Sequence, residues 1–207
     1  YEEAAMLEPM AVAVHAMRRI QPHKNDTTVI LGLGTIGMLL LMFLKDAGIE
    51  KILAVGNKKF QRNTVLALGL DSKTQNVSEW VMQHTNHAGA DVFFECVGRN
   101  ETLSQAVDLT APMGHICLVG NPYSDMTLEQ SVYWKILRNQ IAITGTWNSS
   151  FTHQNDDDWH YVLDRLAQKK ISPKQLISHK LKLEDAESGF LTMRDKRQDY
   201  MKVMIYP

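Results

Sequence analysis

The sequence predicts an α/β fold built on a doubly wound parallel sheet, followed by a smaller C-terminal segment. Three observations support this prediction. Short apolar runs alternate with helical patterns from Thr27 to Thr144. A glycine-rich turn, VILGLGTIGMLL, joins the first apolar run to a helical pattern. The strand-like runs are apolar nearly throughout, as expected of strands that helices cover on both faces.

Local signals set the ends of the elements in the first half of the chain. Met10, Val14 and Met17 recur at helical spacing and predict a helix over 7–19, which ends before Pro22. A β-branched run predicts a buried strand over 27–31, and Gly48 is placed to end the helix that follows the glycines. The other elements predicted here are a helix over 36–46, a strand over 51–55 and a helix over 59–68 that closes near Gly69.

The second half continues the alternation and then changes character. It contains predicted strands over 91–96, 115–119 and 140–144, and a predicted helix over 101–109. After Trp147, where we place a domain boundary, a polar loop leads into a helix over 159–170, a strand over 177–183, a helix from about 185 and a strand over 202–205. We expect Asp156, Asp157 and Asp158 to cap the first of these helices and to face solvent rather than bind a metal.

Composition and charge exclude several classes of partner. The net charge of −1 gives no electrostatic reason to expect nucleic acid or an anionic membrane. No apolar run reaches the roughly 18 residues that a membrane span needs. The two cysteines lie far apart and form neither a disulfide framework nor a C-x-x-C zinc motif. These features favour a cytoplasmic enzyme, and because the chain starts at Tyr1 we expect it to be part of a longer one.

The glycines of the turn have the spacing of a dinucleotide-binding fingerprint. Gly32, Gly34 and Gly37 form G-x-G-x-x-G between a predicted strand and a predicted helix, which is the context that the fingerprint requires. The first glycine makes the tight turn, the second lets the backbone approach a pyrophosphate, and the third lets the helix pack on the strand. The helix N-terminus then offers free N–H groups to the phosphates. The alternative is an ordinary glycine-rich turn.

The second strand lacks the acidic residue of the fingerprint. That residue, about twenty positions after the glycines, would accept hydrogen bonds from the adenosine ribose. The strand ends instead in Gly56, Asn57, Lys58 and Lys59. With no carboxylate to repel a 2′-phosphate and two ammonium groups able to pair with one, this end favours NADP over NAD. Alternatively, the two lysines form the solvated start of the next helix.

Several segments together resemble the zinc-dependent alcohol dehydrogenase superfamily, the medium-chain dehydrogenases. In the family's order they are LEPMAVAVHAMRR, VILGLGTIGMLL, DVFFECVGRNETLSQAV, MGHICLVGNP, LRNQIAITGTWNSSF and YMKVMIYP. The polyol branch, with sorbitol dehydrogenase and galactitol-1-phosphate 5-dehydrogenase, is the most similar. The resemblance implies that residues 1–8 end a catalytic domain, that 9–147 form the Rossmann domain that binds the dinucleotide, and that 148–207 return to the catalytic domain.

The resemblance also implies a catalytic zinc site shared with a β-rich domain upstream of Tyr1, so that the chain alone is expected to be inactive. Glu8, in the pair Glu8-Pro9, matches a glutamate of the polyol branch that lies at the Zn²⁺. Such a zinc stabilises the alkoxide of the substrate, and its other ligands would lie upstream. From the residues alone, Glu8 is better explained as a carboxylate favoured by the dipole of a helix start.

Further residues match the family's dinucleotide contacts. Thr35 and Ile36 match positions at the pyrophosphate, and three segments match positions after strand ends, where such sheets bind ligands. These segments are Cys96, Val97 and Gly98; Val119, Gly120 and Asn121; and Gly145, Thr146 and Trp147, the last group lying along the nicotinamide in the family. Cys96 is equally well explained as a small buried side chain, and we do not expect it to be a nucleophile or a zinc ligand.

The sequence thus predicts an oxidoreductase that uses zinc and NAD(P) to oxidise a secondary hydroxyl of a polyol or of a sugar phosphate such as galactitol 1-phosphate. One alternative is a zinc-free reductase of the quinone oxidoreductase type, against which Glu8-Pro9 speaks. Another is a non-catalytic dinucleotide-binding module. The expected partners are a small-molecule substrate and a second copy of the chain, paired through the Rossmann domain near 140–144, with no nucleic acid and no membrane.

Overall fold

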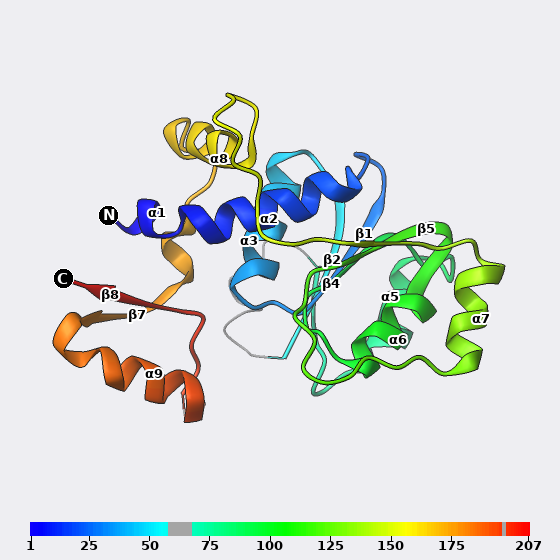
Figure 1. Cartoon of the computed structure of the whole chain (residues 1–207). Helices are drawn as coiled ribbons and strands as arrows, with labels where there is room; N and C mark the ends of the chain where they lie inside the picture. The colour runs from blue at the N-terminus through cyan, green and yellow to red at the C-terminus, as the bar shows by residue number, and fades with distance from the viewer. Residues whose placement is uncertain (58–67, 196–197) are drawn as a thin grey trace.

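The computed structural model describes residues 1–57, 68–195 and 198–207. Its main body is a parallel sheet with the strand order β3-β2-β1-β4-β5-β6 (Figure 1). These strands are β1 (Thr27–Leu31), β2 (Lys51–Gly56), β3 (Leu68–Asp71), β4 (Ala90–Glu95), β5 (Thr110–Leu118) and β6 (Ala142–Gly145). The order reverses between β1 and β4, which is the switch point where doubly wound sheets bind ligands. The predicted fold class is confirmed.

Helices cover both faces of this sheet. α2 (Leu7–Ile20) and α3 (Thr35–Asp46) share one hydrophobic core with Ile30 and Phe94. A second core contains the neighbouring strand residues Val29 and Phe93 together with side chains of three further helices, α5 (Val77–His84), α6 (Asn100–Leu109) and α7 (Gln130–Arg138). Since successive strand residues point to opposite faces, the two cores lie on opposite sides of the sheet.

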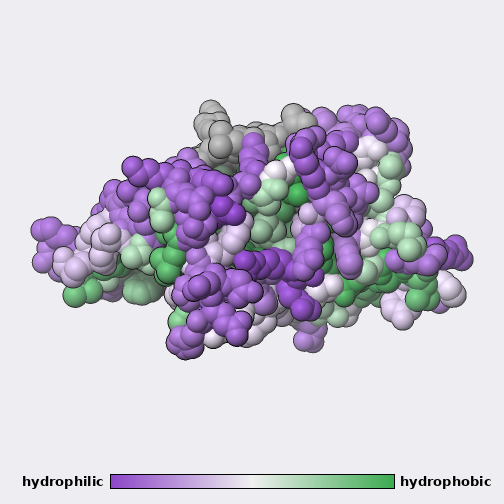
Figure 2. Space-filling model, turned by 90° about the horizontal axis from the view of Figure 1, so that it is seen from above, coloured by the Kyte–Doolittle hydropathy of each residue, from purple (hydrophilic) through white to green (hydrophobic). Residues whose placement is uncertain are grey.

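The C-terminal part folds back onto the first core. α8 (Asp158–Ala167) packs on α2, and Val162 joins the core around α2 and α3. β7 (Ile177–Lys182) and β8 (Lys202–Tyr206) pair in parallel as a separate sheet, next to α9 (Ala186–Asp195) and the short α1 (Glu2–Ala5). Both termini lie at this small sheet (Figure 1). Seen from the side of α8, the surface is mainly hydrophilic (Figure 2).

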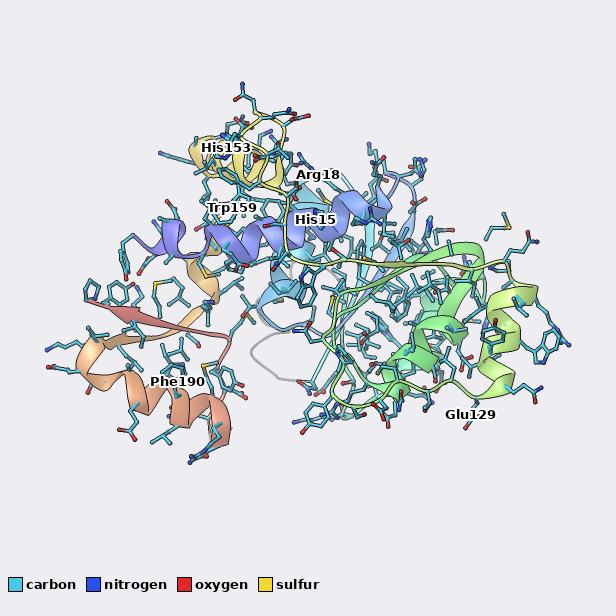
Figure 3. All side chains as sticks on the ribbon, in the orientation of Figure 1. His15, Arg18, Glu129, His153, Trp159 and Phe190 are labelled. Atoms are coloured by element: carbon cyan, nitrogen blue, oxygen red, sulfur yellow. The ribbon has the colours of Figure 1, made fainter. Side chains whose placement is uncertain are left out.

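A buried aspartate fastens the loop after β6 to α2. Asp158 is 2% exposed, and its Oδ2 accepts the N–H of Ser150 and lies 2.8 Å from Nδ1 of His15. Its Oδ1 accepts a hydrogen bond from Arg18 at 3.0 Å. Figure 3 shows His15 and Arg18 on the side of α2 that faces this loop and α8. The loop is therefore held to α2 by charge-assisted hydrogen bonds.

The neighbouring Asp157 caps α8, as predicted. Its side chain accepts the N–H of His160 at 2.9 Å, and it also accepts the N–H of Thr152 at 2.9 Å. The prediction that the aspartates face solvent is wrong for Asp157 and Asp158. Their oxygens are buried because backbone N–H groups and the side chains of α2 and α8 enclose them, and tertiary partners of this kind leave no local pattern in the sequence.

Some elements differ from the sequence prediction. β3, α5 and α7 are not among the elements predicted from the sequence. In α7 only Val132 is buried, whereas Trp134 and Leu137 are exposed. Leu68 begins β3 where a helix end is predicted, and the rest of that predicted helix lies largely outside the described residues. No helix in the described part of the chain is long and apolar enough to cross a membrane.

The bonds of Asp157 predict that acid weakens the fold. Burial alone would raise the pKa of Asp157, but the N–H and imidazole of His160 and the N–H of Thr152 lower it to about 2, from an ordinary 3.8. Because the pKa is lower in the folded state, the carboxylate stabilises the fold above about pH 4, and this contribution is lost as the pH falls towards about 2.

We therefore expect Asp157→Asn to lower the free energy of unfolding near neutral pH, as measured by urea titration. The difference from the unsubstituted chain should shrink as the pH falls from about 4 to about 2, because the protonated aspartate resembles asparagine. A difference of the same size at every pH would contradict the assignment.

Candidate functional site

The glycine turn after β1 has the geometry that its spacing predicts. Gly32 has a φ of +106°, which side-chain-bearing residues rarely adopt. A Cβ on Gly37 would collide with the carbonyl oxygen of Gly32, so close packing of α3 on the turn requires a glycine there. A Cβ on Gly34 would meet nothing within 4 Å. The turn is therefore tight, closely packed on its inner side and open at Gly34.

The N-terminus of α3 carries no capping side chain. Gly34 is the N-cap residue and makes no side-chain hydrogen bond, and the N–H groups of Thr35, Ile36 and Gly37 have no carbonyl of their own helix to bond. Free N–H groups at the positive end of a helix dipole favour an anion. The hydroxyl of Thr35 is already engaged, since it donates to the carbonyl of Met201 at 3.1 Å. Thr35 can therefore offer its backbone N–H.

A buried glutamate organises the turns after β4 and β5. Glu95 is 2% exposed, and its carboxylate accepts the N–H of Val97 at 2.8 Å and the N–H of Gly98 at 2.9 Å. Its main-chain carbonyl accepts the N–H groups of Val119 and Gly120. Glu95 is not among the residues predicted from the sequence; the available signal is a charged residue that directly follows the apolar run VFF.

The turns after β1, β4 and β5 pack backbone to backbone. A Cβ on Gly98, which has a φ of +81°, would collide with the carbonyl of Asn121, and a Cβ on Gly120 would collide with the N–H of Gly98. A Cβ on Gly32 would lie 2.7 Å from Val97 Cγ2. The structure thus brings the glycine turn together with the predicted residues after β4 and β5.

The predicted residues after β6 lie beside this cluster. The N–H of Thr146 donates to the carbonyl of Leu118 in β5 at 3.2 Å. The hydroxyl of Thr146 is buried and makes no hydrogen bond among the described residues, so it is a group that a bound ligand can satisfy. Gly145 and Trp147 are exposed.

The structure describes only part of the segment that follows β2, where the adenosine end of a dinucleotide is expected. Asn57 follows β2 at the same edge of the sheet and is exposed. Lys58 and Lys59, on which the preference for NADP rests, lie outside the described residues. The preference for NADP over NAD therefore stays a prediction.

The surroundings of Cys96 disfavour the thiolate form of its side chain. Burial, and then the negative charge of Glu95, raise the pKa of its thiol well above the ordinary value. A thiol that stays protonated is a poor nucleophile and a poor metal ligand. This agrees with the expectation that Cys96 serves neither role.

Glu8 lies in the first turn of α2 and is exposed, without a hydrogen bond or ion pair to the described residues. A catalytic zinc takes three protein ligands. Among the described residues, no group of three or more His, Cys, Asp or Glu side chains lies close enough to hold a metal. One carboxylate does not make a zinc site, so the role of Glu8 stays a prediction.

A cavity of about 280 Å³ lies away from the strand ends, between α3 and the segment 170–175. Met38, Leu41, Met42 and Ile171 contribute to its apolar wall. None of the site residues predicted from the sequence lines it. The candidate site is therefore the open edge of the sheet rather than this cavity.

Comparisons with known proteins agree with this geometry. The chain is similar to L-idonate 5-dehydrogenase from Vitis vinifera, with 32% identity over 92% of the chain and 52% of that protein. It is 26% identical to galactitol 1-phosphate 5-dehydrogenase from Escherichia coli strain K12 over 100% of the chain and 60% of that protein. The crystal structure of 2R,3R-butanediol dehydrogenase from Bacillus subtilis matches the whole chain and 58% of its own, with a TM-score of 0.86 and 26% identity.

The chain spans about half to three fifths of the length of these relatives. Residues 35–168, which run from the glycine turn to the end of α8, match the family of zinc-binding dehydrogenases. That stretch is well over half of the chain and contains most of the site described above. The chain therefore belongs to the zinc-binding dehydrogenase family.

Proposed function

We propose that this chain holds the dinucleotide of an oxidoreductase that interconverts a secondary alcohol of a polyol or sugar phosphate and the corresponding ketone. The observation that carries the proposal is the uncapped N-terminus of α3, which meets three glycine-packed turns at the switch point of the sheet. Two relatives, named for L-idonate and galactitol 1-phosphate, support the class of substrate.

In this proposal, each part of the dinucleotide binds at a different strand end. The N–H groups of Thr35, Ile36 and Gly37 would hold the pyrophosphate, and the end of β2 at Asn57 would hold the adenosine. The nicotinamide half would then lie over the ends of β4, β5 and β6, where the unpaired hydroxyl of Thr146 is available. When bound, the dinucleotide supplies the hydride acceptor for the alcohol carbon, whose hydroxyl proton passes to solvent.

Gly34→Ala tests whether the glycine turn binds the dinucleotide. The new methyl group meets nothing within 4 Å, so we expect an unchanged melting temperature. It projects from the open side of the turn, where the backbone must approach the pyrophosphate, so we expect the Kd for NADP⁺ to rise at least about tenfold, or about 1.4 kcal/mol. Titration calorimetry on the 207-residue chain would measure the Kd. Undiminished affinity would place the ligand elsewhere.

The complete reaction needs groups beyond this chain, and we propose that a catalytic domain upstream of Tyr1 supplies them. In this proposal Glu8 contributes to a zinc site whose other ligands lie in that domain. The family and the Glu8-Pro9 pair support it. The chain alone is then expected to bind the dinucleotide without turning over substrate.

Initial rates of NADP⁺ and NAD⁺ reduction by the complete gene product would test the reaction. We expect oxidation of galactitol 1-phosphate, with NADP⁺ preferred because no acid follows β2 to repel a 2′-phosphate. Galactitol and sorbitol serve as unphosphorylated controls. Equal rates on the free polyols would indicate a general polyol dehydrogenase, and no rate on any of them, in protein that contains zinc, would contradict the proposed substrate class.

We also propose that the chain pairs with a second copy through β6 and α7. β6 is the last strand of the sheet, and an unpaired strand edge is a ready surface for another chain. In α7, which directly precedes β6 in the chain, Trp134 is 46% exposed and Leu137 is 51% exposed. Hydrophobic side chains reach the surface at this end of the molecule, at the lower right of Figure 2.

Light scattering after size exclusion would test the pairing. We expect the unsubstituted chain to elute as a dimer and Leu137→Asp to elute as a monomer, because a charge would be buried in the interface. Leu163→Asp is the matched control, since Leu163 is similarly exposed at 49% but lies on α8. A monomeric unsubstituted chain would contradict the proposal.

We place the protein in the cytoplasm, as its two free cysteines are in keeping with a reducing compartment. Cell fractionation that finds the complete protein mainly outside the cytoplasm would contradict this placement.

A further inference from the structure

Glu95 is a buried carboxylate with no cation beside it in the described part of the chain. Its polar contacts there are the backbone N–H groups of Val97 and Gly98, and it takes part in no ion pair among the described residues. These N–H dipoles stabilise the charge but do not cancel it. An uncompensated charge in such a site acts on its surroundings more strongly than one in water. Consistent with this, the charge of Glu95 contributes to the raised pKa of the adjacent Cys96 thiol.

The position of Glu95 in the sheet determines which part of a bound dinucleotide lies closest to it. In register, Glu95 pairs with Leu31 of β1 on one side and with Leu118 of β5 on the other. The pyrophosphate turn follows β1, and the adenosine side lies beyond it at β2. Glu95 therefore lies on the other side of the pyrophosphate, at the strand ends assigned above to the nicotinamide half.

The nicotinamide ring is a cation in the oxidised dinucleotide and neutral in the reduced one. We propose that the Glu95 carboxylate makes this site discriminate between the two redox states, favouring NAD(P)⁺ over NAD(P)H. The inference rests on the proposed function, because it needs the dinucleotide to bind at this edge. By linkage, tighter binding of the oxidised form makes the bound dinucleotide harder to reduce. Glu95 thus sets how strongly the bound cofactor drives oxidation of an alcohol.

The ratio of the two dissociation constants separates this role from a structural one. Repulsion between Glu95 and the pyrophosphate acts equally on both redox forms, so it cancels in the ratio of the Kd for NADPH to the Kd for NADP⁺. A general loosening of the turn after β4 also weakens both forms together. Only an interaction that depends on the charge of the ring changes the ratio.

The test is a set of titrations of the 207-residue chain with NADP⁺ and with NADPH. Glu95→Gln keeps a side-chain oxygen for the N–H groups of Val97 and Gly98 but removes the charge. We expect the Kd ratio, NADPH over NADP⁺, to fall about three- to tenfold in this variant, as Coulomb's law gives for nearby unit charges at an intermediate dielectric constant. Glu95→Asp retains the charge and should keep the ratio within about twofold of the original, even if both affinities fall.

Asp91→Asn is the matched charge control. Asp91 lies at the opposite end of β4 and, like Glu95, accepts a backbone N–H, that of Thr27. We expect this substitution to leave the ratio unchanged. An unchanged ratio in Glu95→Gln, or an equal fall in Asp91→Asn, would overturn the inference while leaving the proposed function intact. Failure of the unsubstituted, folded chain to bind either form would overturn the proposed function itself.

Discussion

The contact between three turns at the carboxyl edge of the sheet is the constraint on which the site depends. The turns after β1, β4 and β5 meet backbone to backbone, and this contact requires glycine at 32, 98 and 120. Packing of this kind leaves backbone N–H groups that must find acceptors inside the protein. Glu95 provides them, with its carboxylate for the turn after β4 and its carbonyl for the turn after β5. The same carboxylate that completes the packing also places a negative charge where the proposed cofactor changes its charge.

The C-terminal part of the chain is tied to its first half at two points. Asp158 binds His15 and Arg18 of α2 and so fixes the loop that continues from Trp147. At the other point, the hydroxyl of Thr35 bonds to the carbonyl of Met201. The segment after β6 is therefore held to α2, and the residue before β8 is held to the glycine turn, although these partners are far apart in the sequence.

Much of this fold follows from local patterns in the sequence. The sheet is predicted by the apolar runs of β1 and β4, and the turn by the spacing of Gly32, Gly34 and Gly37. In each case the residues of the element itself indicate its burial or its backbone geometry. α7 is not predicted from the sequence, and its burial does not follow from its apolar residues, since Val132 is buried whereas Trp134 and Leu137 are exposed.

The remaining parts of the site depend on contacts between distant residues. The burial of Asp158 could not be read from the sequence, as its partners on α2 lie about 140 positions away. Glu95 is not predicted for a related reason, since a single charged residue at the end of a strand belongs to no repeating hydrophobic pattern. The fold of this chain adds no support to the proposed role of Glu8 at a metal, because a metal site needs ligands that the described residues do not bring together.

The most direct test of the account is to follow the backbone amide resonances of the 207-residue chain during titration with NADP⁺. We expect the largest changes in the N–H groups of residues 34–37 and in the turn at Val97 and Gly98. Changes confined to other surfaces, such as the cavity between α3 and residues 170–175, would contradict it.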